Sequence, residues 1–157
     1  MGMIILDQNF LAIATPLIAK AKTEILLSSF KLEYTDRTRG KKLYAFFLEL
    51  FAAQARGVKV HVLFNWHADR RSVAKTNFNA GCELKNKNIA VRYLPSNRCC
   101  HSKLLIIDRE YAFVGSHNLS VKSTTENFEI SYLITEKDEV KNLRLIYEEI
   151  FTNGIKF

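Results

Sequence analysis

The sequence lacks the features that define secreted and membrane-spanning proteins. Its three cysteines, Cys82, Cys99 and Cys100, are an odd and partly clustered set, which makes no disulfide framework and suits a reducing cytosol. Polar residues at 7–9 separate the two apolar stretches near the N-terminus, and Pro16 interrupts the second, so neither makes a transmembrane span. No basic segment leads into an apolar core with a cleavage site. We therefore expect a cytoplasmic protein without a membrane span, unless the chain has been trimmed.

Patterns that bind metals are missing as well. The sequence contains no H-E-x-x-H motif, no glycine-rich phosphate loop and no carboxylates spaced for two metal ions. Cys99 and Cys100 precede His101, but zinc-binding cysteines are usually two to four residues apart, and adjacent side chains converge poorly on one ion. We expect the cysteines to be small buried hydrophobes. The sequence thus predicts no metal and no cofactor, and an activity that survives chelation.

Positive charge is in excess. The 157 residues include 23 lysines and arginines against 16 acidic residues, a net charge of +7 that a dimer would double. Such an excess favours polyanions through steering and counterion release. A solvated basic surface that keeps the protein soluble would have the same composition. Charge alone therefore leaves nucleic-acid binding and solubility as open alternatives.

The most informative segment has the pattern H-x-K, four residues, then D. The short apolar run at 104–107 predicts a buried strand. Because side chains alternate along a strand, His101 and Lys103 should point into one pocket. Asp108 has the opposite parity, so we expect it outside that pocket unless the strand has already ended.

A second pattern, G-S-x-N, follows six residues later. Residues 108–110 predict a tight turn into a second strand at 111–114. Gly115 ends that strand and, without a Cβ, permits a close backbone approach. Ser116 and Asn118 would then offer a hydroxyl and an amide at the mouth of the same hairpin.

These two patterns together resemble the signature of the phospholipase D superfamily, whose members cleave phosphodiester bonds. The resemblance extends upstream, where a helix followed by Arg56, Gly57 and a strand from Val58 is similar to the family's N-terminal portion, and it covers nearly the whole chain. It implies an α/β fold with a mixed, mainly parallel β-sheet flanked by helices on both faces. It also implies a single phospholipase D-like catalytic domain over residues 1–157.

Hydrophobic periodicity predicts alternating helices and strands over the same range. We expect helices at 9–22, 41–56, 69–81 and 137–151. Gly57 suits the end of the second helix and Asp69 the N-cap of the third. We expect strands at 24–30, 58–64, 89–94, 104–107, 111–114 and 128–135.

The resemblance implies a role for each signature residue. His101 is the expected nucleophile, which would form a phosphohistidine. Lys103, Ser116 and Asn118 are expected to act in catalysis and bind the phosphoryl oxygens of the substrate, although Ser116 and Asn118 are also ordinary turn residues. The sequence holds one signature, whereas the mechanism uses two histidines. The resemblance therefore implies a homodimer that joins two copies of His101.

Two acids complete the expected catalytic set. Glu129 lies on the polar face of a predicted strand, at the place where family members carry an acid that contacts the signature histidine and would orient its ring. An exposed strand acid is the alternative, and Glu126 replaces Glu129 if the register differs. Asp108 is the signature acid and a secondary catalytic candidate, but its parity favours a turn or a stabilising role.

Other polar and aromatic residues follow the strand at 58–64. We expect Trp66, His67 and Arg70 to contact the substrate, although a lone tryptophan packs more often than it stacks on a base. His61 is expected to be a satisfied strand residue. His117 alternates with its neighbours and should face away from their pocket.

The favoured function is a metal-independent endonuclease that acts on DNA or RNA. Compact single-signature members of the resembled family are mostly nucleases. A phospholipase D-type lipid hydrolase would need two signatures or a dimer with an apolar acyl-binding surface. A nucleic-acid-binding module that has lost catalysis, within a larger assembly, is the remaining alternative.

Overall fold

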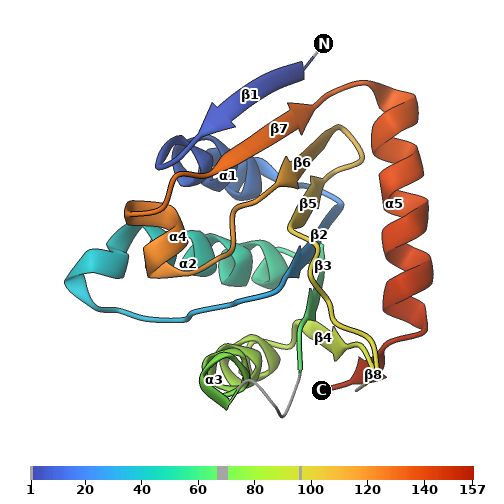
Figure 1. Ribbon diagram of the computed structural model, residues 1–157. Helices are drawn as coiled ribbons and strands as arrows, with labels where there is room; N and C mark the ends of the chain where they lie inside the picture. Colours follow the sequence, from blue (N-terminus) through green and yellow to red (C-terminus); the bar gives the residue numbers. More distant parts are fainter. Residues whose placement is uncertain (1, 67–70, 96) are drawn as a thin grey trace.

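The computed structural model describes residues 2–66, 71–95 and 97–157 (Figure 1). In this part of the chain one eight-stranded sheet has the order β1-β7-β6-β5-β2-β3-β4-β8. The strands are β1 (Gly2–Leu6), β2 (Glu24–Ser29), β3 (Lys59–Phe64), β4 (Ala90–Tyr93), β5 (Leu104–Ile107), β6 (Tyr111–Gly115), β7 (Ile130–Ile134) and β8 (Ile155–Lys156). The helices are α1 (Asn9–Lys20), η1 (Thr38–Gly40), α2 (Lys41–Ala55), α3 (Arg71–Asn86), α4 (Val121–Thr125) and α5 (Lys137–Thr152).

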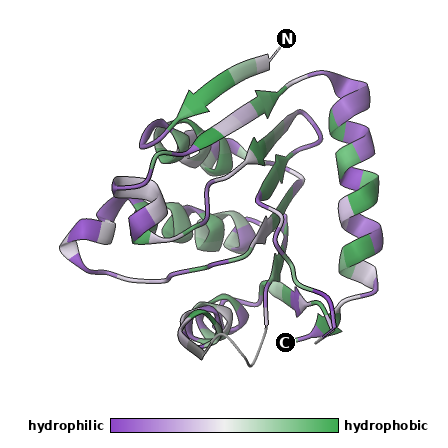
Figure 2. Ribbon diagram, in the orientation of Figure 1, coloured by the Kyte–Doolittle hydropathy of each residue, from purple (hydrophilic) through white to green (hydrophobic). Residues whose placement is uncertain are grey.

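Helices cover both faces of the sheet. Figure 1 shows α1 and α2 together on one side and α5 alone on the other. The side chains of β2 alternate between two apolar clusters: Ile25 and Leu27 pack with α1 and α2, and Leu26 packs with Tyr147 of α5. Strand β2 is buried along its whole length, which explains its continuous apolar run. Figure 2 shows the central strands as hydrophobic and α5 as a mixture of both classes.

The predicted α/β fold, with a mixed sheet and helices on both faces, is confirmed, but the predicted predominance of parallel strands is wrong. Among the described strands only β2–β3 and β3–β4 pair in parallel, and the other five neighbouring pairs are antiparallel. The connection between β5 and β6 shows the reason. A short turn can join only antiparallel neighbours, because a parallel pair needs a crossover of a dozen residues or more.

The predicted turn at 108–110 is confirmed. Asp108 and Arg109 have φ angles of 53° and 61°, and Glu110 N donates a 3.0 Å hydrogen bond to Ile107 O. Positive φ at both central residues is the geometry of the hairpin turn that matches the twist of its strands. Gly57 ends α2 with a φ of 91°, as expected for a residue beyond a helix C-terminus.

Most predicted elements are present with shifted ends. The first helix stops at Lys20 rather than Lys22, and the third continues to Asn86 rather than Gly81. The expected N-cap of the third helix, Asp69, lies outside the described residues. Strands β1 and β8 and helix α4 were not predicted. Strands β1 and β8 form the two edges of the sheet, where β1 pairs with β7 and β8 pairs with β4. The formation of each edge strand depends on a partner that is distant in sequence.

Candidate active site

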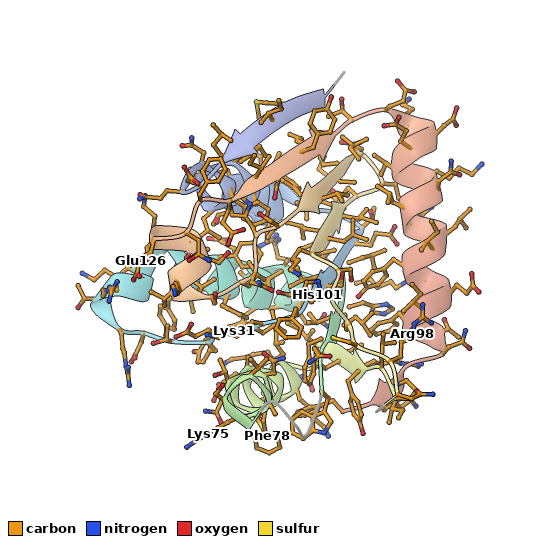
Figure 3. All side chains as sticks on the ribbon, viewed as in Figure 1. Lys31, Lys75, Phe78, Arg98, His101 and Glu126 are labelled. Atoms are coloured by element: carbon orange, nitrogen blue, oxygen red, sulfur yellow. The ribbon has the colours of Figure 1, made fainter. Side chains whose placement is uncertain are left out.

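His101 and Lys103 lie together just before β5, as their alternation predicted. Lys103 Nζ is 3.1 Å from His101 Nδ1 and donates a 2.7 Å hydrogen bond to the carbonyl oxygen of His101. Both residues line a 510 Å³ cavity between the sheet and α5, and Figure 3 shows His101 in the middle of the view. Burial lowers the pKa of Lys103, although nearby Cys100 and Glu129 act in the opposite direction. An imidazole and a cation thus face one opening, which suits them to hold and attack a phosphoryl group.

Phe30, directly after β2, contacts both groups and was not singled out from the sequence. Its ring centroid is 5.0 Å from that of His101, and Lys103 Nζ lies 5.7 Å from the same ring. The carbonyl oxygen of Phe30 accepts a 2.9 Å hydrogen bond from Asn77 Nδ2 of α3. In the sequence, Phe30 is the last apolar residue of a strand, and no local signal distinguishes it from a core residue.

Two buried asparagines connect the loops around the site, and neither belongs to a sequence motif. Asn77 Nδ2 also donates to Asn65 O at 2.7 Å, and Asn77 Oδ1 accepts from Leu32 N at 2.8 Å. Asn65 Oδ1 accepts a 3.1 Å hydrogen bond from Cys100 N, next to His101 in the chain. These bonds hold the ends of β2 and β3, helix α3 and the segment before His101 in one network.

Ser116 lines the same cavity as His101 and Lys103 and is held by Glu129. Its hydroxyl donates to Glu129 Oε2 and accepts a 3.0 Å hydrogen bond from Ile130 N. Gly115 permits this arrangement, because a Cβ there would overlap Ser131 and the backbone of β7. The close approach predicted for Gly115 is therefore confirmed.

Glu129 is buried and accepts three side-chain hydrogen bonds. Besides Ser116, Ser123 Oγ donates at 2.8 Å and Asn127 Nδ2 at 3.0 Å. Burial by itself raises the pKa of this carboxyl, but the three hydrogen bonds outweigh it and hold the pKa below the usual value. The alternative of an exposed strand acid is wrong. A contact between Glu129 and His101 stays a prediction.

Asn118 is fixed at both its backbone and its side chain. Its N–H donates to Ser123 Oγ at 2.9 Å, and its Oδ1 accepts a 3.0 Å hydrogen bond from Lys31 N. Because the side-chain oxygen is engaged, the amide is held with its NH₂ group as the remaining donor. Asn118 therefore shapes the loop, and its expected contact with the phosphoryl oxygens stays a prediction.

Asp108 lies at the opposite end of β5 from His101. Its Oδ1 accepts from Thr23 N (2.8 Å), Thr23 Oγ1 (2.9 Å) and Glu24 N (3.1 Å), and its Oδ2 accepts from Lys22 N (2.8 Å). Burial acts to raise the pKa of Asp108, but these hydrogen bonds together lower it. The stabilising role favoured by its parity fits this geometry. The secondary assignment of Asp108 to catalysis does not, because β5 separates it from His101.

Trp66 is half-buried, and His67 and Arg70 lie outside the described residues. The Trp66 ring packs among other aromatic rings, with centroids 5.7 Å from Phe78 and 6.0 Å from Tyr93. These neighbouring rings therefore cover part of the Trp66 side chain. Its expected contact with a substrate base stays a prediction.

His117 and His61 both pack against aromatic rings away from His101. His117 is buried, stacks on Phe10 and contacts Ser131 Oγ at 2.7 Å, away from the His101 cavity as expected. His61 stacks on Phe151, and burial lowers its pKa to about 4. The expectation that His61 is fully satisfied is wrong, because its buried Nδ1 has no hydrogen-bond partner.

Glu126, the alternative acid, is exposed and pairs with Arg39 on the surface. Figure 3 shows Glu126 on the α4 side of the view, apart from His101. Glu129, rather than Glu126, is the acid that accepts the Ser116 hydroxyl.

The cysteines are not equivalent. Cys100 is buried, and burial raises its pKa, whereas Cys99 is exposed and Cys82 is intermediate. The expectation of buried hydrophobes is confirmed for Cys100 and wrong for Cys99. In the described ranges no group of three or more His, Cys, Asp or Glu side chains could hold a metal ion. Across the same residues, none of the helices is long and apolar enough to span a bilayer.

Comparison with known proteins identifies the fold and the signature. The sequence profile of the family described as "Cardiolipin synthase, PLD-like domain" matches residues 15–151. The chain belongs to the phospholipase D superfamily. In the described α/β unit, His101 and Lys103 of the H-x-K signature line the cavity between the sheet and α5.

Individual relatives differ in how much they share with this phospholipase D-family chain. Cardiolipin synthase 1 of Staphylococcus aureus is 29% identical over 102 residues, which are 65% of this chain and 20% of that protein. Nuc from Salmonella typhimurium, a phospholipase D family member, has a TM-score of 0.81 at 18% identity, covering 100% of this chain and 99% of its own. NucT from Helicobacter pylori has a TM-score of 0.78 at 16% identity, with the same coverage. The chain thus spans a fifth of the first relative's length but shares a fold with the other two from end to end.

Proposed function

We propose that this chain is a metal-independent phosphodiesterase, an endonuclease that hydrolyses DNA or RNA, with residues 1–157 as one catalytic domain of a homodimer. The observation that carries the proposal is the joint position of His101, Lys103 and Ser116 on one cavity. A nucleophile, a cation and a hydroxyl surround the space where a phosphate would lie. None of these groups requires a metal ion to act.

The first chemical step forms a covalent intermediate. A neutral imidazole nitrogen of His101 attacks phosphorus, a P–N bond forms and the P–O bond to the leaving group breaks. Lys103 and the Asn118 amide stabilise the charge on the phosphoryl oxygens. The partner's His101, in its protonated form, gives a proton to the leaving oxygen.

Hydrolysis of the phosphohistidine completes the reaction. The partner's His101, now neutral, takes a proton from water as the water oxygen attacks phosphorus, and the P–N bond breaks. One phosphodiester and one water become one phosphomonoester and one alcohol.

An uncovered apolar strip beside the site supports the homodimer. The strip consists of residues on the α5 side of β6, β7 and β1, namely Ile4, Leu6, Val114, Ile130 and Tyr132, and of Phe128 two residues before β7. Phe128 is 77% exposed and Ile4 is 66% exposed. Val114 pairs with Leu104, and both line the His101 cavity, so the strip is continuous with the site. Contiguous exposed apolar surface of this kind marks an interaction site.

A second copy of the chain would cover the apolar strip and would also supply the second histidine that the mechanism uses. Residue Ile146 of α5 is also exposed and lines the same cavity. A two-fold axis at the cavity mouth would bury each strip against the partner's α5 and bring both copies of His101 to one phosphate. We expect Ile130→Glu to convert dimers to monomers and abolish cleavage. Leu48→Glu, at an exposed leucine of α2, is the matched control that should leave the dimer intact.

Sedimentation of both variants tests this interface, and mixing tests the shared site. After complete subunit exchange, an equal mixture of the unaltered chain and His101→Ala should retain about one quarter of the activity, because one pair in four has both histidines. Retention of about one half would mean that each chain works alone, and a monomeric unaltered protein would contradict the dimer.

Charge favours nucleic acid over lipid as the substrate. The chain carries +7, and a pair would carry twice that, which attracts a polyanion far more strongly than a single headgroup. A phospholipid is the second candidate, because the cavity beside His101 has a largely apolar lining that includes Leu63, Leu104 and Leu143. The family profile also takes its description from cardiolipin synthase.

One assay separates these substrates. The purified protein and His101→Ala are incubated in EDTA with single- and double-stranded DNA and RNA, and separately with vesicles of phosphatidylcholine or cardiolipin. Cleavage of nucleic acid that the variant lacks is the expected result. Hydrolysis of the vesicles alone would support the lipid enzyme, and tight nucleic-acid binding without cleavage would support a non-catalytic module. Acid quenching with a ³²P-labelled substrate should trap the label on the protein.

A further inference from the structure

Aromatic rings cluster beyond the active site, where β3 ends and α3 runs beneath it. The Phe78 centroid is 5.7 Å from that of Trp66 and 5.6 Å from that of Phe157, and Trp66 is 6.0 Å from Phe157. Trp66 packs partly against the core, whereas Phe78 is 47% exposed. A partly buried aromatic cluster thus ends in an exposed ring on the surface of α3.

A lysine shares this surface. Lys75 is exposed and lies three residues before Phe78 in α3, so the two side chains are neighbours on one helix face. Figure 3 shows Lys75 and Phe78 side by side below α3, with His101 and Lys31 above the helix. A flat apolar ring beside an ammonium group matches a base beside a phosphate.

Hydrogen bonds connect this surface to the catalytic segment. Asn77, the residue before Phe78, donates to the carbonyl oxygens of Phe30 and Asn65. Asn65, the residue before Trp66, accepts from Cys100 N, next to His101. The aromatic surface and His101 are therefore fixed relative to each other rather than carried on independent loops.

We propose that Trp66 and Phe78, with Lys75, form a platform that stacks an unpaired base of single-stranded nucleic acid while another part of the strand lies at His101. The inference rests on the proposed nuclease function and narrows its substrate class to single strands or unpaired ends. The aromatic edge supplies stacking, Lys75 contacts a phosphate, and the asparagine network sets the distance to the scissile bond.

The preference for single strands follows from what an aromatic face can reach. Bases in a duplex already stack on their neighbours, so a protein ring reaches one only after it has been unstacked and unpaired. In a single strand every base has an available face, and stacking on it tolerates any sequence. The platform therefore selects for strandedness without selecting for sequence.

Trp66 allows a direct test because it is the only tryptophan in the chain. In a His101→Ala background, which prevents cleavage, we expect single-stranded oligonucleotides to quench tryptophan emission and an equal concentration of duplex to quench it far less. Phe78→Ala should weaken single-strand binding about 5- to 100-fold, with a smaller effect on duplex binding. The loss should grow with strand length over about 4 to 16 nucleotides, because a short strand at His101 does not reach the platform.

Control variants separate stacking from folding. Phe78→Trp should retain the preference for single strands, and Leu48→Ala, which removes an equally exposed apolar side chain from α2, should not change it. Circular dichroism identifies any variant that fails to fold. Unchanged tryptophan emission with single strands would overturn the platform, as would an unchanged ratio of single-strand to duplex affinity in Phe78→Ala. Cleavage by the unaltered protein would still support the proposed nuclease function. Absence of cleavage with every nucleic acid would instead remove the function on which the platform depends.

Discussion

At one end of β5, Lys103 Nζ lies 3.1 Å from His101 Nδ1 at the mouth of an open cavity. At the other end, Asp108 accepts four hydrogen bonds from Lys22, Thr23 and Glu24. Both ends belong to one H-x-K-x₄-D pattern, and the four-residue strand between them separates their surroundings completely.

The two ends differ in what their polar groups contact. Asp108 accepts hydrogen bonds from three backbone N–H groups and the Thr23 hydroxyl where α1 connects to β2, so its charge is compensated within the fold. The ammonium of Lys103 and the imidazole of His101 instead sit beside each other and an aromatic ring, where a substrate phosphate would be their best partner. A single motif therefore combines a catalytic end with a structural end, and a motif match alone does not distinguish them.

The largest effect should come from removing the nucleophile. His101→Ala is expected to lower phosphodiester hydrolysis about 10⁴-fold or more, because it removes the group that forms the covalent intermediate. Thermal unfolding should change little, since His101 is exposed. Initial rates on a labelled oligonucleotide measure the first effect. A rate within about tenfold of the unaltered protein would remove His101 from the mechanism.

Lys103→Ala should lower kcat about 10²- to 10³-fold, the usual cost of losing one group that stabilises developing charge. Lys20→Ala, at an exposed lysine of α1, serves as the matched control and should be neutral. If both variants lost the same activity, a general reduction in positive charge would explain the result, and Lys103 would have no special role at this end of β5.

Asp108→Ala tests the structural end. We expect it to lower the free energy of unfolding by about 2–3 kcal/mol, because several hydrogen bonds to a charged acceptor are lost. Activity per folded molecule should be retained, and Glu110→Gln in the same turn should be neutral for both. Urea unfolding combined with the assay above measures both quantities. Loss of activity without loss of stability would place Asp108 in the catalytic machinery after all.

The contribution of Asp108 should also depend on pH. Its pKa in the folded protein lies below the ordinary 3.8. The stabilisation is therefore complete above that value and is lost as pH falls through the folded pKa. The difference in unfolding free energy between the unaltered protein and Asp108→Ala should be constant near neutrality and shrink below about pH 4. A difference independent of pH would mean that charge contributes nothing.

Glu129→Gln should have the smallest effect, about a tenfold loss of activity, because Ser116 keeps a partner but loses a charged acceptor. Glu126→Gln, at the exposed acid paired with Arg39, is the control. A role for Glu129 in orienting His101 would also shift the pH–rate profile of the variant, which a merely structural role would not do.

Part of this site could be predicted from the sequence. Strand alternation placed His101 and Lys103 together and excluded Asp108 from their pocket. The lack of a Cβ at Gly115 predicted the close backbone approach there. Phe30, Asn65 and Asn77 could not be found, because each contacts the site through residues far away in the chain. The predominance of parallel strands was wrongly predicted for a similar reason: the antiparallel pairs β1–β7 and β2–β5 join segments that are far apart in the chain.

The sequence by itself determined the signature, its alternation and the sign of the charge, since these depend on residue types and on spacings of a few residues. Only the tertiary structure decided which strands pair, which asparagines hold the site and which apolar face stays uncovered. Those outcomes depend on contacts between segments more than a hundred residues apart, such as Gly2 and Ile134, where local periodicity carries no information.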